Sequence, residues 1–500
     1  MNANLYALLR DHFAEHGEQP CILHPGGTVI HYDDLDAMAA RLAHVLVDAG
    51  CEKGDRVAAQ VDKCWQALAL YLACLRAGLV YLPLNTGYQK SELAYFFGDA
   101  EPRVIVCAPD HLATVAALRP EATVLTLSGD EGTLLDLARE APETFDTVVS
   151  APDDLAAILY TSGTTGRAKG AMLSHRNLAS NALTLVDAWG FTRGDVLLHA
   201  LPLYHVHGLF VACHCALLSA SRMIWLLKFN AAEVMEQLPH ASVMMGVPTF
   251  YTRLLAEAAF TEDACRSVRL FISGSAPLLP ETFNEFRSRS GHAILERYGM
   301  SETGMNTSNP LRGERICGSV GPPLPGVTLR VVDDDARPCL AGAIGGIEVK
   351  GPNVFAGYWR MPDRTRDEFT ADGFFKTGDM GELLDNGYLK IVGRAKDLII
   401  TGGLNVYPKE IEERIDALPG IAESAVIGVP DPDFGEAVTA VVVAKAGHAP
   451  SEADLIDALK AEIANFKVPK RVHFVDELPR NAMGKVEKNT LRQRYSVSSP

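Results

Sequence analysis

The chain has 500 residues, nearly half of them hydrophobic, which is enough apolar material for more than one folded domain. Its 62 acidic residues outnumber its 46 basic residues, and the formal net charge of −16 excludes general binding to the phosphate backbone of nucleic acids. No uncharged apolar run approaches the roughly 20 residues of a membrane-spanning helix, and the polar start of the chain does not have the pattern of a secretory signal.

Up to about Val327 the chain alternates two patterns. Apolar residues recur at helical spacing over 33–50 and 63–85. Short apolar runs that are typical of buried strands occur at 103–108, 154–161, 242–247 and 268–274. Helices interleaved with brief buried strands predict layered α/β subdomains with largely parallel sheets.

The pattern changes after Val327. Residues 328–351 and 373–394 each contain two strand-like runs around a polar turn, which predicts a small antiparallel section. The remaining residues predict helices and strands at 408–418, 422–430, 437–446 and 452–466. We therefore predict an α/β protein with a large N-terminal domain over 1–394 and a small α+β C-terminal domain over 395–500.

The stretch YTSGTTGRAKG at 160–170 combines glycines, hydroxyls and cations directly after a strand-like run. Glycine lets backbone N–H groups approach a ligand closely, and the hydroxyls and the ammonium of Lys169 add further donors. These groups together predict a polyphosphate cradle. The stretch is not a Walker A loop, because Lys169 follows Gly166 by three positions and precedes Gly170. On the residues alone, a plain turn stays the alternative.

This stretch closely resembles the phosphate loop of the adenylate-forming enzymes, which include acyl- and aryl-CoA synthetases, peptide-synthetase adenylation domains and firefly luciferase. Further motifs occur in the order of that family, and they span most of the chain: GSAP at 274–277, RYGMSET at 297–303, KTGD at 376–379, GRAKDLIITGGLNVYPKEIE at 393–412 and PRNAMGK at 479–485. The segments 201–210, 245–255 and 296–310 resemble the malonyl-CoA synthetase branch of the family.

The resemblance implies a reaction in two steps. ATP converts a carboxylate into an acyl-AMP with release of pyrophosphate, and the thiol of coenzyme A then displaces AMP. The residues that the resemblance implies as catalytic are Lys485, Thr165, Glu302 and His205. Lys485 matches the mobile lysine that contacts the carboxylate and the α-phosphate, and Glu302 matches the glutamate that binds Mg²⁺ between the phosphates.

The resemblance also implies the nucleotide site. ATP or AMP is expected to contact residues of four motifs: Thr161, Ser162, Gly163, Thr164, Thr165 and Lys169; Gly274, Ser275 and Ala276; Glu296, Tyr298, Gly299, Met300 and Ser301; and Asp379 and Arg394. Tyr298 is expected to lie against adenine. Asp379 would accept both ribose hydroxyls, and Arg394 would contact the same sugar or the phosphate.

A moving C-terminal domain is a further implication of the resemblance. Lys396 matches the hinge about which this lid domain rotates between the two steps. The rotation would carry Lys485 away and bring Gly402 and Gly403 to the tunnel of the coenzyme A thiol. On the residues alone, a glycine hairpin turn is equally compatible with these two glycines.

Arg297 is the residue that indicates which acid is used. A guanidinium in a closed pocket costs free energy without a partner, and a second carboxylate on the substrate would supply one. We therefore expect a short dicarboxylic acid, malonate in the branch that the chain resembles. The alternatives are that Arg297 pairs with a protein carboxylate such as Glu296 or turns outward.

The same pocket is expected to contain His205, Val206, Ser275 and Met305, with His207 in a structural role. Val206 and Met305 are expected to limit bulk at the middle carbon of the substrate. Because pocket packing separates one methyl group by only about 1–3 kcal/mol, methylmalonate is a second expected substrate.

Several functions stay open on the sequence alone. Another small acid (oxalate, an acetate-like or an aryl acid), transfer to a carrier protein in place of coenzyme A, and a nucleotide sensor without catalysis are the alternatives. The ten cysteines form no CxxC pair, which favours reduced thiols in a cytoplasmic protein.

Overall fold

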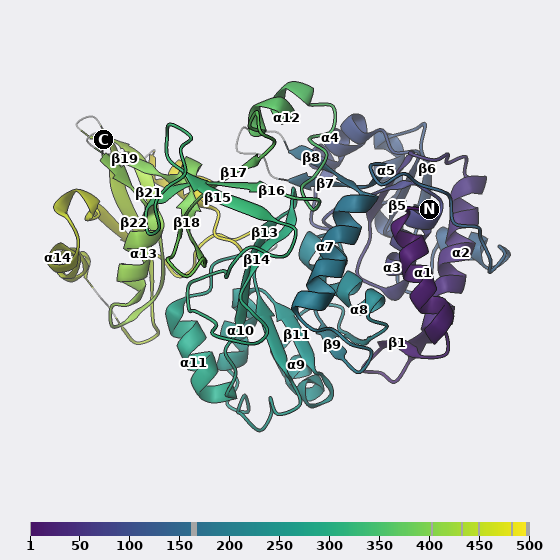
Figure 1. Ribbon diagram of the computed structural model, residues 1–500, viewed down its shortest axis with the longest axis horizontal. Coiled ribbons are helices and arrows are strands. Elements are labelled where there is room, and N and C mark those ends of the chain that lie inside the picture. Colours follow the sequence, from purple (N-terminus) through teal and green to yellow (C-terminus); the bar gives the residue numbers. More distant parts are fainter. Residues whose placement is uncertain are drawn as a thin grey trace.

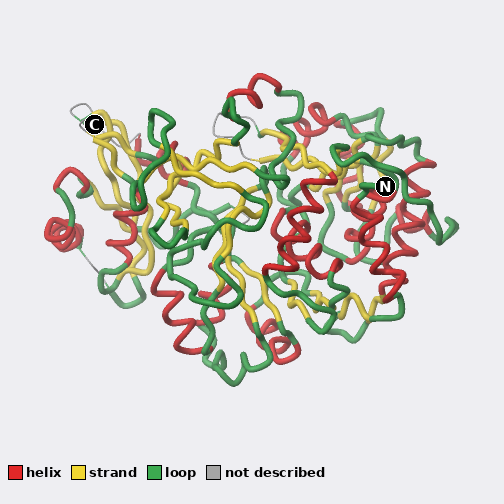
Figure 2. Tube along the Cα trace, viewed as in Figure 1, coloured by secondary structure: helices red, strands yellow, loops and turns green. Residues whose placement is uncertain are grey.

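The computed structural model describes residues 2–161, 168–401, 404–431, 434–448, 451–481 and 484–496. In this part of the chain the strands form four sheets (Figures 1 and 2). Two α/β sheets and one antiparallel sheet belong to the large domain. The fourth sheet lies in the small domain, at the end of the molecule away from the N-terminus. The predicted fold class is confirmed.

The first sheet has the strand order β6-β5-β3-β4-β7-β8. Its strands are β3 (Arg56–Gln60), β4 (Val80–Pro83), β5 (Val104–Cys107), β6 (Thr123–Thr126), β7 (Leu155–Thr161) and β8 (Lys169–Ser174). Neighbouring strands are parallel except β7 and β8, which pair antiparallel with Thr161 opposite Lys169. The glycine- and hydroxyl-rich stretch therefore connects β7 to its neighbour β8, the edge strand of this sheet.

The second sheet has the order β14-β13-β12-β11-β9-β10-β1-β2. Its strands are β1 (Pro20–Leu23), β2 (Val29–His31), β9 (Val196–His199), β10 (Arg222–Trp225), β11 (Val243–Gly246), β12 (Leu270–Ser273), β13 (Leu295–Met300) and β14 (Gly304–Ser308). The pairs at the two edges are antiparallel and the inner pairs are parallel. The mostly parallel pairing agrees with the predicted α/β layers.

Helices pack against these two sheets. They are α1 (Leu5–His16), α2 (Tyr32–Asp48), α3 (Trp65–Arg76), α4 (Lys90–Ala100), α5 (Leu112–Leu118), α6 (Thr133–Ala138), α7 (His175–Ala188), α8 (His214–Leu218), α9 (Ala231–Gln237), α10 (Pro248–Leu255) and α11 (Pro280–Ser290). Two 3₁₀ turns, η1 (Pro109–His111) and η3 (Leu238–His240), and the π-helix η2 (His207–Cys213) complete this region.

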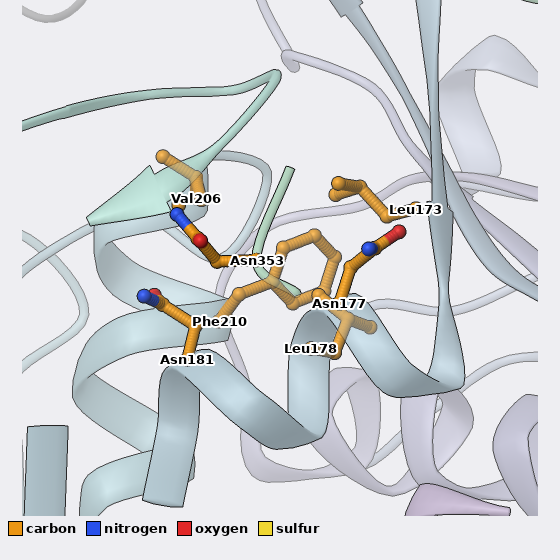
Figure 3. Close-up of a pocket in the computed structure, with 8 residues that line it drawn as sticks. Leu173, Asn177, Leu178, Asn181, Val206, Phe210 and Asn353 are labelled. Atoms are coloured by element: carbon orange, nitrogen blue, oxygen red, sulfur yellow. The ribbon is translucent and has the colours of Figure 1, made fainter. Parts of the chain in front are cut away.

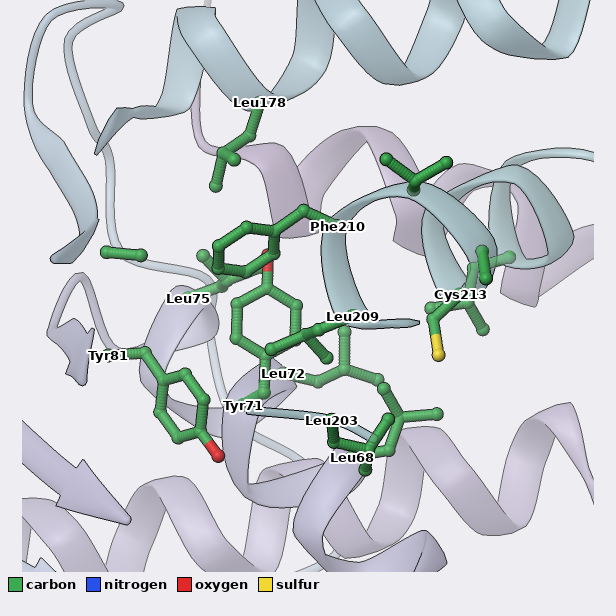
Figure 4. Packing of buried hydrophobic residues seen from close by; sticks show 14 of the residues in the cluster. Leu68, Tyr71, Leu72, Leu75, Tyr81, Leu178, Leu203, Leu209, Phe210 and Cys213 are labelled. Carbon is green, nitrogen blue, oxygen red and sulfur yellow. The ribbon is translucent and has the colours of Figure 1, made fainter. Parts of the chain in front are cut away.

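Helix α3 lies in the centre of the large domain and is buried on all sides after its first residue. Its residues Leu68, Tyr71 and Leu72 lie with Leu209 and Phe210 of η2 in one apolar cluster (Figure 4). The predicted helical stretch 63–85 is too long, because α3 ends at Arg76. Gly78 takes a φ of 69° in the turn, and the chain continues as β4.

The antiparallel section contains the order β15-β16-β17-β18, with strands β15 (Thr328–Val332), β16 (Ile344–Lys350), β17 (Phe375–Leu383) and β18 (Leu389–Arg394) and the helix α12 (Pro362–Glu368). Both predicted two-strand units are therefore confirmed. In the register of β17 with β18, Asp379 lies opposite Arg394.

The small domain has its own apolar core. It contains β19 (Ile399–Thr401), β20 (Leu404–Val406), β21 (Ile421–Asp431), β22 (Gly435–Ala444), β23 (Arg471–Phe474), α13 (Pro408–Asp416), α14 (Glu452–Glu462), α15 (Lys488–Ser496) and the turns η4 (Ala395–Asp397) and η5 (Asn465–Lys467). The predicted domain boundary at residue 394 coincides with the end of β18, and it stays a prediction. No described helix is both long and apolar enough to cross a membrane.

Candidate active site

The phosphate side of the candidate site begins where β7 and β8 meet. The hydroxyl of Thr161 donates to Oε1 of Glu302 at 3.4 Å. Lys169 is buried, and its Nζ lies 3.5 Å from Oε1 of Glu368 and 4.3 Å from the centre of the Tyr358 ring. The predicted contacts Ser162, Gly163, Thr164 and Thr165 lie outside the described residues.

Glu302 is a buried carboxylate at the turn between β13 and β14. Its Oε1 accepts a hydrogen bond from the hydroxyl of Tyr358 at 3.1 Å. Burial raises the pKa of Glu302, and the hydrogen bond and the nearby cations oppose that rise. Tyr358 therefore contacts both Lys169 and Glu302, a role that sequence reasoning missed. No periodicity or charge pattern marks Tyr358.

Tyr298, Asp379 and Arg394 form a connected group where β13 of the second sheet meets β17 and β18 of the antiparallel sheet. The hydroxyl of Tyr298 donates to Oδ2 of Asp379 at 2.5 Å, and Nε of Arg394 lies 2.7 Å from Oδ1 of the same carboxylate. Asp379 lies within β17 opposite Arg394. Each oxygen of Asp379 keeps lone pairs for a further hydroxyl donor.

The segment after β12 borders this group. Ser275 adopts a left-handed backbone with a φ of 71°, which is unusual for a residue with a side chain. Its hydroxyl lies 3.3 Å from Nδ1 of His207. Ala276 is half-buried, and so are Gly299, Met300 and Ser301 at the end of β13. The predicted nucleotide contacts at 274–276 and 296–301 therefore lie on neighbouring segments, because β12 pairs with β13.

Arg297 is an enclosed guanidinium, with 4% of its surface exposed. Within the described residues, Nε and Nη2 are buried and have no hydrogen-bond partner. Burial lowers the pKa of Arg297 to about 10. A Cβ atom at Gly274 would overlap the guanidinium, so only glycine leaves room for it there.

The two alternatives for Arg297 are wrong. Its low exposure excludes an outward orientation. Glu296 does not pair with it either, because Oε1 of Glu296 accepts a hydrogen bond from the N–H of Gly318 at 3.1 Å. Neighbouring residues of a strand point to opposite faces, and Glu296 and Arg297 follow that rule in β13.

His205, Val206 and His207 form one wall beside Arg297. Nδ1 of His205 accepts the N–H of His207 at 3.2 Å. Burial and the charge of Arg297 lower the pKa of His205 to about 4, so its ring is neutral at physiological pH. His207, expected to be structural, is also buried, and its contact with Ser275 places it next to the predicted pocket residues.

Val206 and Met305 are buried, as residues that limit a pocket must be. Val206 also lines a small cavity between η2 and α7 (Figure 3). The other residues around that cavity are Leu173, Asn177, Leu178, Asn181, Phe210, Gly304 and Asn353.

The small domain brings Lys485 to the candidate site. Lys485 lies in a turn between Arg480 and Val486, and a Cβ at Gly484 of that turn would lie 3.2 Å from the Thr249 hydroxyl of α10. Loss of water around the ammonium and the charge of Arg394 lower the pKa of Lys485 to about 8, although part of the side chain is exposed.

Contacts between the two domains support this arrangement. Nζ of Lys445 in the small domain lies 2.7 Å from Oε1 of Glu281 in α11. The predicted hinge residue Lys396 is exposed in η4, directly after β18. The predicted tunnel residues Gly402 and Gly403 lie outside the described residues.

In the part of the chain that the structure describes, no three histidine, cysteine, aspartate or glutamate residues form a group that could hold a metal ion by themselves. A magnesium ion that arrives with a nucleotide needs only one or two protein carboxylates, because phosphate oxygens and water complete its shell. Glu302, beside Thr161 and Lys169, fits that requirement.

The site has three chemical parts. Lys169 and Glu302 suit a polyphosphate with its cation, Tyr298 and Asp379 suit a nucleoside, and Arg297 suits an anion in a closed chamber. Lys485 lies where the small domain meets this group. The arrangement can therefore bind a nucleotide and a small anionic molecule side by side.

Comparison with known proteins agrees with this chemistry. Residues 9–359 match the family described as AMP-binding enzyme, and residues 410–485 match the AMP-binding enzyme C-terminal domain. The crystal structure of ATP-bound MatB from Rhodopseudomonas palustris is 57% identical to this chain, with a TM-score of 0.97 and coverage of 99% of both chains.

Two curated relatives represent different acids. The mitochondrial malonate–CoA ligase ACSF3 of Mus musculus is 38% identical over 487 residues, which cover 89% of this chain and 83% of the relative. A feruloyl-CoA synthase from Amycolatopsis is 35% identical over 474 residues, with coverage of 94% and 95%. Identity to these two relatives alone does not separate a short diacid from an aryl acid.

Proposed function

The chain belongs to the AMP-binding enzyme family, and on that premise we propose that it is a malonate–CoA ligase. It converts malonate, ATP and coenzyme A into malonyl-CoA, AMP and pyrophosphate through malonyl-AMP. Its similarity to MatB and to malonate–CoA ligases supports this function. The observation that carries the choice of acid is the buried Arg297, whose Nε and Nη2 have no partner in the described chain.

Malonate complements Arg297 because it has two carboxylates. One carboxylate reacts with ATP, and the other would form a charge-assisted pair with the guanidinium. An aryl acid would leave the buried charge unpaired, at a cost of several kcal/mol in typical proteins. In this proposal the acid must also be small, because Val206 and Met305, which are both buried, would limit the space at its middle carbon.

In the first step, a carboxylate oxygen of malonate attacks the α-phosphorus of ATP and the bond to pyrophosphate breaks. Negative charge develops on the phosphate oxygens, so the step needs cations in fixed positions. In this proposal Lys485 contacts the carboxylate and the α-phosphate, while Lys169 and the hydroxyl-rich stretch 161–165 hold the outer phosphates. Tyr298 lies against adenine, and Asp379 accepts the ribose hydroxyls.

Glu302 would hold Mg²⁺, with phosphate oxygens and water as the other ligands. The ion supplies charge neutralisation at the phosphates when it is bound. Tyr358 fixes the carboxylate of Glu302 by its hydrogen bond at 3.1 Å and contacts Lys169 with its ring. One side chain, Tyr358, thus holds both Glu302, which would bind the metal ion, and Lys169, which would contact the phosphates.

In the second step, the thiol of coenzyme A attacks the acyl carbon and AMP leaves. The neutral ring of His205 lies beside the acyl chamber as a polar wall. Rotation about Lys396 would carry Lys485 away and bring Gly402 and Gly403 to the thiol. Since Lys396 is exposed and directly follows β18, a rotation there disturbs little packing.

Activity should decline above pH 8. The pKa of Lys485 is lowered to about 8, so its ammonium loses its proton as the pH rises through that value. We expect kcat/KM for ATP to fall about tenfold per pH unit above pH 8, since this parameter reports the free enzyme. The check is a pH profile of pyrophosphate release under saturating malonate.

Two variants separate this cause from others. In Lys485→Arg the residual activity should decline only at higher pH, because arginine keeps its proton. Burial also raises the pKa of Glu296 to about 8, so Glu296→Gln is the matched control and should keep the decline of the unaltered enzyme. If Glu296→Gln abolished the decline in activity above pH 8, the decline would be due to Glu296.

We propose the cytoplasm as the location of the enzyme. All ten cysteines are free thiols, which suits a reducing compartment. The expected partners are the three substrates, and the acidic net charge gives no basis for nucleic-acid binding.

The test of the function is a pyrophosphate-release assay over a panel of acids, with and without coenzyme A. The expected order is malonate first, then methylmalonate, with acetate, oxalate, benzoate and ferulate far behind. Preference for ferulate or benzoate would contradict the assignment. Release that depends on a carrier protein in place of coenzyme A would show the carrier-loading alternative.

A further inference from the structure

Lys63 is a buried amine outside the site described above, and burial lowers its pKa to about 7. It lies in the loop between β3 and α3, with 8% of its surface exposed. In the described chain no carboxylate forms a salt bridge with it. Its Nζ lies 2.6 Å from Nδ1 and 2.8 Å from the carbonyl oxygen of His199, and 4.3 Å from the centre of the Trp225 ring.

His199 continues the contact toward the acyl chamber. It is the last residue of β9, it is buried, and its ring stacks on Trp225 with centroids 4.9 Å apart. Its Nε2 lies 3.0 Å from the carbonyl oxygen of Gly208. His199 thus bonds on one side to Lys63 and on the other to the π-helix η2.

The two bonds of His199 have a defined direction. A carbonyl oxygen only accepts, so Nε2 carries the proton and donates to Gly208. Burial lowers the pKa of His199 well below its ordinary value, so the ring is neutral and Nδ1 accepts from the amine of Lys63. Lys63, His199 and Gly208 therefore form a continuous chain of hydrogen bonds, called the relay below, and Sγ of Cys213 in η2 lies 3.3 Å from the same Nε2.

The relay ends at the wall of the acyl chamber. Gly208 follows His207, whose Nδ1 lies 3.3 Å from the hydroxyl of Ser275. A Cβ at Gly208 would overlap the carbonyl oxygen of Pro202, so the backbone there fits tightly against the preceding turn. A π-helix is a rare backbone form that is often found at functional sites.

Burial of a lysine beside Trp225 without an anionic partner costs the free energy of hydration of its amine. A methionine would fill it without removing an amine from water. What lysine adds is a set of directed donors at the end of β9. The relay also joins the first sheet, through the loop after β3, to the second sheet, through β9.

We propose that Lys63 and His199 are positioning residues that hold the segment 205–207 in place for binding of the acid. The identity of that acid rests on the proposed function. Neither residue touches the substrate. They affect malonate binding indirectly. Their hydrogen bonds hold the carbonyl of Gly208, and Gly208 directly follows the wall residues 205–207.

The test compares two variants of His199 in the full-length enzyme. His199→Gln places an amide donor near the position of Nε2 and retains the bond to Gly208. His199→Asn places its amide near Nδ1 and loses that bond. For His199→Asn we expect KM for malonate to rise about tenfold with KM for ATP within about twofold, and for His199→Gln a rise in malonate KM of less than about threefold.

Tyr71→Phe is the matched control, because it removes a buried hydrogen bond of 2.8 Å to His214 in the same core. It should leave both KM values within about twofold of the unaltered enzyme. Lys63→Met should reproduce His199→Asn, and its melting temperature shows whether it folds. If Lys63→Met does not fold, the two His199 variants decide.

The proposal is overturned if His199→Asn and His199→Gln have the same malonate KM, or if the KM values for ATP and malonate rise together. A preference of the unaltered enzyme for another acid would instead contradict the proposed function. The same comparison, made with that other acid, would still decide whether the relay positions the wall.

Discussion

Lys485→Ala should lower malonate-dependent pyrophosphate release by at least about 100-fold, because it removes the cation that the proposed first step places at the α-phosphate. Supplied with preformed malonyl-AMP and coenzyme A, the same variant should form malonyl-CoA at a rate within about threefold of the unaltered enzyme. The measurement is stopped-flow or quenched assay of the two half-reactions separately.

Lys460→Ala is the matched control for loss of one lysine from the small domain. Lys460 lies on α14 and pairs with Asp457 at the surface, at 3.0 Å. It should leave both half-reactions unchanged. Equal loss of both half-reactions in Lys485→Ala would contradict the assignment, since it would place Lys485 in the structure of the domain and not in one step.

Arg297→Ala should raise the KM for malonate by about 100-fold or more and change the KM for ATP by less than about threefold. Truncation of one partner of a buried charge pair typically costs about 2–5 kcal/mol, and malonate loses that partner while ATP does not. The check is the initial rate as a function of each substrate. The KM for acetate, which has no second carboxylate, should rise much less than the KM for malonate in the same variant.

Two further variants make the result specific. Arg297→Lys keeps a charge without the two-pronged geometry and should lie between the unaltered enzyme and Arg297→Ala. Arg315→Ala removes another partly buried arginine, which donates to the carbonyls of Pro310, Ala293 and Leu311. It should leave the ratio of the two KM values unchanged. If Arg297→Ala used malonate normally, the argument for malonate as the substrate would be wrong. The argument for adenylation as the reaction would be unaffected.

The sequence was sufficient for the order of the elements and for the family. Strand-like runs around polar turns predicted the strands of 328–351 and 373–394, and the resemblance of the ordered motifs predicted an adenylate-forming enzyme. Element ends were less predictable. The stretch 63–85 reads as one helix because its apolar residues are continuous, yet Gly78 ends the helix by adopting a positive φ that the pattern does not encode.

Contacts between distant segments could not be read from the sequence. Tyr358 contacts Lys169 and Glu302, and these three residues come from three separate segments. The relay of Lys63, His199 and Gly208 connects two sheets. Tyr358, Lys63 and His199 are unremarkable in their local patterns. Their contacts depend on packing that brings distant chain positions together, 136 residues apart for Lys63 and His199 and 56 for Tyr358 and Glu302.

Arg297 shows where the division lies. The sequence by itself determined that a guanidinium precedes Tyr298, with an acidic neighbour at Glu296. Only the tertiary structure decided that the guanidinium is enclosed and that the neighbour bonds to Gly318 instead. The physical reason is that strand pleating sends adjacent side chains to opposite faces, and the free energy of a buried charge depends on every segment that closes around it.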